Sequence, residues 1–130
     1  MEVSIDLSDA VQQALAAEGH NVCAPPLPLD FDQHLPFSRI QTLEGGTRTD
    51  MVLDTRTVLI ETWAENMADA MVECSVVAAR VVELQGEMLG GVPCYSVELV
   101  SLPAEDHDPY HKDLPMASAT ARISTRVMHL

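Results

Sequence analysis

The stretch 55–85 places a strand pattern directly before a helix pattern, and it constrains the fold more than any other part of the chain. Residues 55–64, TRTVLIETWA, are apolar on both faces of an extended backbone, which is typical of a central strand. Asn66 can then cap a helix, with Asp69 completing a capping-box-like pair, and Gly86 can end it. A strand that leads straight into a helix predicts a sheet covered by helices.

The helix expected over 66–85 is apolar around most of its circumference. Its polar stripe is narrow and consists of Asp69, Glu73, Arg80 and Glu83. A chain of 130 residues has limited core with which to surround such a helix, so the helix is a candidate subunit interface. The alternative is that it lies across its own sheet without a partner.

Shorter patterns indicate the other elements. A first helix is expected between residue 7 and Gly19, capped by Asp6 or Ser8. Strands are expected at 36–43, 91–102 and 116–130, the last with a regular alternation of inward and outward positions. The order is helix, strand, strand, helix, strand, strand. It predicts an α+β fold in one domain, 1–130, with a single mostly antiparallel (mixed) β-sheet of about four strands and two α-helices packed on one face.

Composition narrows the possible functions. Hydrophobic residues make up 47% of the chain and charged residues 21%, as in ordinary globular proteins. The formal net charge of -13 repels nucleic-acid phosphates and anionic membranes, which argues against DNA recognition. Cys23, Cys74 and Cys94 are an odd number without C-x-x-C spacing, so we expect reduced thiols. The acidic N-terminus predicts no signal peptide, and no apolar run has the ~20 residues that cross a bilayer.

Two polar segments are the places to look for chemistry. The first, Glu44–Asp50, is expected to be a hairpin turn rather than a phosphate loop, because it lacks the G-x-x-x-x-G-K-[ST] spacing. The second, Ala104–Leu114, reads as an exposed loop. It contains Asp106, His107, Asp108, His111 and Asp113, which are potential ligands for a divalent metal. Pro109 prevents the two histidines from sharing a regular helix, and a solvated loop is the preferred interpretation. Trp63 is expected to pack at the strand-to-helix corner.

The order of these motifs resembles the tail terminator proteins of long-tailed, siphovirus-like phages, in the versions found in phages and prophages of actinobacteria. The resemblance covers residues 1–130 in element order and is most specific over 36–70. The proline-rich segment Pro25–Pro36 has no place in the pattern. The residues that carry the resemblance are Arg39, Gly45, Gly46, Thr55, Arg56, Glu61, Trp63, Ala64, Gly91, Val92, Tyr95, Pro103, Asp108, Pro109 and Thr120.

The resemblance implies a structural virion protein without catalysis or cofactor. Subunits of that family form a hexameric ring on the finished tail tube, stop its elongation and present a face to the head-tail connector. The implied partners are further copies of the chain, the tube protein and the neck or connector protein. Genomic DNA would pass through the ring without sequence-specific binding. The implied location is the head-proximal end of the virion tail, after assembly in the host cytoplasm, with no membrane association.

Within this hypothesis the two polar segments are expected to contact the neighbouring subunit or the tube. The residues proposed for that interface are Arg39, Glu44, Gly45, Gly46, Arg48, Asp50, Arg56, Asp106, His107, Asp108, Tyr110, His111 and Lys112. The excess of acidic residues could line the hole and let DNA slide past. Two alternatives stay open: a neck or head-completion connector protein, and a small metal-dependent or ligand-binding protein that uses the 104–114 loop.

Overall fold

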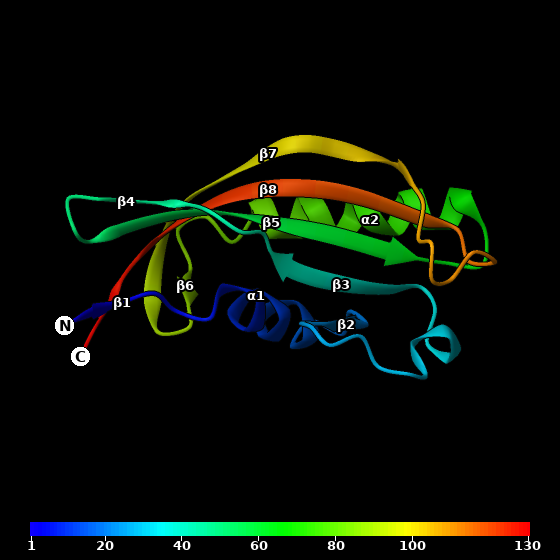
Figure 1. Ribbon diagram of the computed structural model, residues 1–130, viewed down its shortest axis with the longest axis horizontal. Coiled ribbons are helices and arrows are strands. Elements are labelled where there is room, and N and C mark those ends of the chain that lie inside the picture. The colour runs from blue at the N-terminus through cyan, green and yellow to red at the C-terminus, as the bar shows by residue number, and fades with distance from the viewer.

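Strand β5 (Leu53–Trp63) organises the sheet in the computed structural model, which describes residues 1–130 (Figure 1). It pairs antiparallel with β3 (Phe37–Thr42) on one side and with β8 (Met116–Arg126) on the other. Val58 and Ile60 on β5 are completely buried. The central strand predicted from apolar residues on both faces is thereby confirmed.

The sheet has more strands than the sequence predicts. Its seven strands follow the order β2-β3-β5-β8-β7-β6, with β4 paired to β5 off this path. A separate two-stranded sheet joins β1 and β9. β7 (Val92–Asp106) is the strand expected at 91–102. The additional strands are β1 (Glu2–Val3), β2 (Val22–Cys23), β4 (Thr47–Thr49), β6 (Met88–Leu89) and β9 (Met128–His129). The prediction of about four strands is wrong because strands of two or three residues are too short to show an alternating pattern, whereas the α+β class is correct.

Both helices cover the same face of the sheet, as predicted. Helix α1 (Leu7–Ala16) begins at Asp6, whose side chain accepts from the N–H of Asp9 at 3.2 Å. Helix α2 (Met67–Val82) begins at Asn66, where the reciprocal pair with Asp69 forms at 2.8 and 2.9 Å. A single core of 23 buried residues combines side chains of both helices with the inward positions of the strands. Neither helix is long and apolar enough to cross a lipid bilayer.

A second, smaller cluster lies on the opposite face at one end of the sheet. Phe37, Trp63 and Met116 are register neighbours on three adjacent strands, and Phe31 packs on Trp63 with ring centroids 5.1 Å apart. Phe31 comes from a short 3₁₀ helix, η1 (Phe31–Gln33), inside the proline-rich segment. That segment therefore covers the end of the sheet, and Trp63 packs at the corner as predicted.

Two segment boundaries differ from the prediction. β7 continues to Asp106, so Ala104–Asp106 is strand rather than loop. Within the predicted turn 44–50, Thr47–Thr49 form β4. The chain reverses directly after this strand, at Asp50 and Met51. Gly45 and Gly46 do have positive φ, 92° and 117°, but they lie between β3 and β4 instead of forming the turn. β-branched Thr47 and Thr49 favour pairing over turning.

Candidate interaction surfaces

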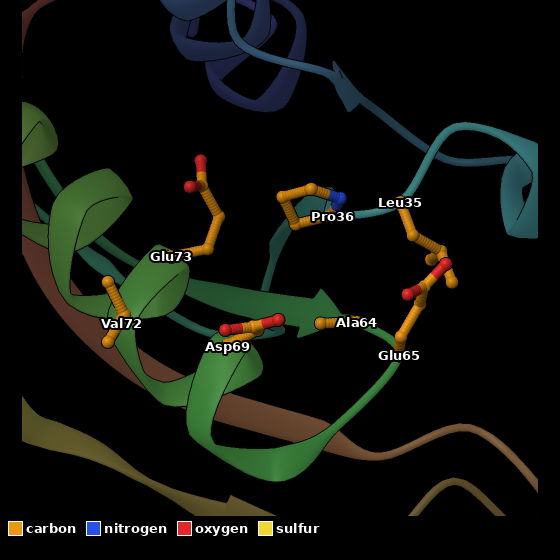
Figure 2. Close-up of a pocket in the computed structure, with 7 residues that line it drawn as sticks. All are labelled: Leu35, Pro36, Ala64, Glu65, Asp69, Val72 and Glu73. Carbon is orange, nitrogen blue, oxygen red and sulfur yellow. The ribbon is translucent and has the colours of Figure 1, made fainter.

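A hollow of about 300 Å³ lies at the corner where β5 passes into α2, and we call it the α2 pocket. Its lining residues are Leu35, Pro36, Ala64, Glu65, Asp69, Val72 and Glu73. Figure 2 shows the segment before β3, with Leu35 and Pro36, standing across from the first turns of α2. The pocket thus combines apolar walls with three carboxylates.

Helical spacing explains why the carboxylates gather there. Asp69 and Glu73 are four residues apart, which aligns them along one side of the first turns of α2, and Glu65 comes directly before the N-cap Asn66. Asp69 is occupied by the helix cap, and Glu73 faces the ring of His20 at 3.6 Å. Glu65 is exposed and has no ion-pair partner, so it is the free charge at the rim.

The other end of β5 carries a projecting hairpin (Figure 1). The chain reverses at Asp50 and Met51, whose φ angles are 53° and 61°, as in the turns that suit two-stranded ribbons. Such angles favour Gly or Asn and are unusual for methionine. The Met51 side chain is nevertheless 73% exposed, beside the partly exposed Val52. We call Thr49–Val52 the hairpin tip.

Two arginines hold the base of the hairpin. Arg48 donates from Nη2 to Asp54 Oδ2 at 2.9 Å and to Ser4 Oγ at 3.0 Å. The hydrogen bonds that Asp54 accepts from Arg48 and from the Ser4 hydroxyl lower the pKa of its carboxyl against the effect of burial. Arg56 donates from Nη1 to the carbonyl of Ile5 at 2.9 Å, while its Nε and Nη2 are buried without a partner. Burial lowers the pKa of Arg56.

Asp108 anchors the 107–115 loop, and it is buried rather than exposed as the sequence predicts. Its carboxylate accepts from Trp63 Nε1 at 3.0 Å, from the backbone N–H of Tyr110 at 2.9 Å and lies 2.7 Å from His111 Nδ1. Burial by itself would raise the pKa of this carboxyl, but the three hydrogen bonds together lower it. The carboxylate is therefore a fixed structural acceptor beneath the loop.

The structure contains no set of side chains that would support the metal-binding alternative. No three His, Cys, Asp or Glu side chains in the structure are placed to hold one metal ion. Asp108 is engaged with both His111 and Trp63, whereas Asp106 accepts from the N–H of His107 at 2.7 Å. The loop residues thus serve its own conformation.

The outward face of α2 is open in the subunit. The helix lies across β5, β7 and β8, and Ala70, Cys74, Val77, Ala78 and Val81 face the core. Its exposed side displays Ala68, Asp69, Val72, Ser75, Val76 and Ala79, with Asp69 in the first turn as the one charged residue among them. Val72 is 63% exposed and Val76 45%. The helix predicted to be apolar around most of its circumference is therefore buried along only one side in a single subunit.

A second open feature is the outer edge of β7. β6 pairs only with Val92 and Pro93, which leaves the rest of that edge without a strand partner. Val100 and Leu102 are 50% and 73% exposed on it. The register between β7 and β8 shifts at three places along the strand. Such irregularities make an exposed edge less able to pair with strands of other molecules.

The residues proposed from the sequence fall into two groups at opposite ends of the molecule (Figure 1). The hairpin group contains Glu44, Gly45, Gly46, Arg48, Asp50 and Arg56. The group at the other end contains Arg39, which pairs with Glu61 at 2.7 Å and lies over Trp63, together with Asp106, His107, Asp108, Tyr110, His111 and Lys112. They do not form one continuous site.

The sequence interpretation missed the α2 pocket and the exposed Met51. A signal for the first was present in the four-residue spacing of the acids before and within α2. The opposite wall, Leu35 and Pro36, comes from a segment without a readable pattern. The Met51 turn lacks the Asn-Gly or Asp-Gly pair that marks such hairpins in a sequence.

The chain matches no family model, and no curated protein is similar to it in sequence.

Proposed function

We propose that this chain is a structural virion protein, a tail terminator that caps the phage tail tube as a ring of six copies. In this role it stops tube elongation and forms the head-proximal joining face. The motif order between 36 and 70 is one source of the proposal, and the surface of the subunit is the other.

The observation that carries the proposal is the outward face of α2, which is largely apolar beyond its first turn on a strongly acidic chain. A solvated helix on a protein of net charge -13 would be expected to carry charge all along its exposed side. Here the only exposed charge of the helix is Asp69 in the first turn, and Val72, Val76 and Ala79 follow it. Open apolar surface of this kind is typical of contact with another protein. A closed ring uses two unlike patches on each subunit, and this surface supplies one of them.

The excess of acid fits the passage of DNA through such a ring. Carboxylates lining the hole would repel the phosphate backbone, so that DNA slides through without binding. Imaging of the assembled ring tests this part, because carboxylates confined to the outer wall would contradict it.

The proposal is tested with the purified chain and with tail tubes. Light scattering after size exclusion should find a species with the mass of six 14.2-kDa chains, alone or after addition of tubes. Tubes assembled with the chain present should stop shorter and carry a ring at one end in electron micrographs. A chain that stays monomeric and leaves tube length unchanged would contradict the proposal.

A pair of variants links the assembly to the α2 face. Val76→Glu places a charge on that face and should abolish assembly. Leu29→Glu alters a fully exposed residue in the proline-rich segment and should assemble normally. Circular dichroism and thermal unfolding should be the same for both variants.

A further inference from the structure

We infer that the hairpin tip of one copy inserts into the α2 pocket of the next copy, with Met51 as the inserted side chain. The inference rests on the proposed ring and specifies its two contact patches. It follows from the position, the chemistry and the backbone of these two features.

Position is the first argument. β5 begins at Leu53, directly after the tip, and ends at Trp63, directly before Ala64 and Glu65 of the pocket. Eleven residues of strand at about 3.3 Å each hold the two features about 36 Å apart on one rigid element. A projection at one end and a hollow at the other join copies head to tail. Such a contact produces a closed ring whenever the rotation between copies closes.

Shape and polarity are the second argument. Met51 is 73% exposed, and Val52 beside it is 36% exposed. The pocket has a volume of about 300 Å³ and apolar walls from Leu35, Pro36 and Val72, which gives room for a side chain of methionine's size. Methionine is unbranched and polarisable and fills irregular apolar spaces well.

Charge is the third argument. Of the seven cationic side chains, Arg39, Arg48, Arg80 and Arg122 already form ion pairs within the subunit. Arg126 forms none, and it stands opposite Leu53 in the register, at the foot of the tip. The rim of the pocket offers Glu65 without a partner. Insertion of the tip brings Arg126 of one copy toward Glu65 of the next.

The backbone of the tip is the fourth argument. A non-glycine residue in the left-handed region costs on the order of 1–2 kcal/mol, and Met51 has a φ of 61°. Glycine at this position would fold the same turn with less strain. A strained turn that presents a large apolar side chain to solvent is expected where that side chain has a binding partner.

The main test is Met51→Gly, which removes the inserted side chain and relaxes the turn. The thermal midpoint should stay the same or rise, whereas self-association measured by sedimentation should weaken about tenfold or more. Arg126→Glu should weaken it by a few-fold, and the double variant Arg126→Glu with Glu65→Arg should restore it. Unchanged association of Met51→Gly would overturn the inference.

Cross-linking tests the contact directly. In a Cys23→Ser background, chains carrying Met51→Cys are mixed with chains carrying Val72→Cys under mild oxidation. In the control mixture, Met88→Cys replaces Val72→Cys, since the two residues are similarly exposed at 64% and 63%. Disulfide-linked pairs should form at least tenfold faster in the test mixture than in this control. Equal rates in the two mixtures would overturn the inference.

The outcomes for the contact and for the ring are separable. A hexamer that persists in Met51→Gly shows that the ring forms through another contact, which removes the inference and keeps the proposed function. A wild-type chain that stays monomeric and does not bind tubes removes the proposed function.

Discussion

The indole Nε1–H of Trp63 donates to the buried carboxylate of Asp108 across 3.0 Å, linking residues 45 positions apart. This bond connects the end of the central strand to the loop between β7 and β8. Phe31 packs against the same indole, so the proline-rich segment and the loop share one anchor. The end of the sheet next to the α2 pocket is therefore held by a polar contact inside an aromatic cluster.

Removal of the Asp108 carboxylate should destabilise the fold. Asp108→Ala leaves the buried Trp63 N–H and the Tyr110 N–H without acceptors, which should cost about 1–3 kcal/mol of unfolding free energy. Urea unfolding followed by tryptophan fluorescence measures the change, since Trp63 is the only tryptophan. The matched control is Asp106→Ala, an exposed carboxylate two residues earlier, which should change the free energy by less than about 0.5 kcal/mol.

Stability should fall with acid in a way that depends on Asp108. Its folded pKa lies below the ordinary value of 3.8, so its carboxylate contributes stability above that value. The contribution is lost as the pH falls through the folded pKa. The difference in thermal midpoint between wild type and Asp108→Asn should therefore be largest near neutral pH and should shrink toward pH ~2. Parallel midpoint curves from neutral pH to that limit would contradict this prediction.

The two glycines after β3 should differ in their tolerance of alanine. A Cβ on Gly46 would stand 2.9 Å from the carbonyl oxygen of Thr55 and 3.0 Å from Arg56 Cγ, at a φ of 117°. A Cβ on Gly45 would meet nothing within 4 Å, so only the φ of 92° opposes it. We expect Gly46→Ala to lower the unfolding free energy by about 1–3 kcal/mol and Gly45→Ala by less. Equal losses in chemical denaturation would show that backbone conformation alone decides both.

The three thiols should react at different rates with a disulfide reagent. Burial raises the pKa of Cys74 to about 11 and also raises the pKa of Cys94, and both side chains are covered. Burial also raises the pKa of Cys23, but its side chain is only partly covered. Because the thiolate is the reactive form, Cys23 should react first, and the other two only after local or global unfolding. Mass spectrometry of the labelled protein identifies the order, and a Cys23→Ser variant should lose the early phase.

The long elements, in which the hydrophobic pattern repeats several times, could be predicted from the sequence. From Ala117 to Arg126 the residues of β8 alternate in burial as expected, because every second side chain faces the helices. The Asn66 cap of α2 was also predictable, since its hydrogen bonds are made within four residues. In both cases the physical cause lies inside the segment itself.

The features that escaped prediction depend on distant segments. The burial of Asp108 depends on an indole from β5, and the α2 pocket depends on Leu35 and Pro36 from a segment without periodicity. β2 and β6 are strands only because a neighbour supplies their hydrogen bonds. The exposure of Met51 follows from the pairing of β4 with β5, which places the turn of the hairpin at Asp50 and Met51.

Strands β1 and β9 bring the two chain ends together. The N-terminal amine of Met1 donates to the carbonyl of Leu130 at 3.0 Å, and the Leu130 N–H donates back at 2.7 Å. Both ends lie on the hairpin side of the molecule (Figure 1). A purification tag fused to either end would project beside the hairpin tip and crowd a neighbouring copy. A circularly permuted chain, with these ends linked and new ones opened in the proline-rich segment, would move the tag away from that contact.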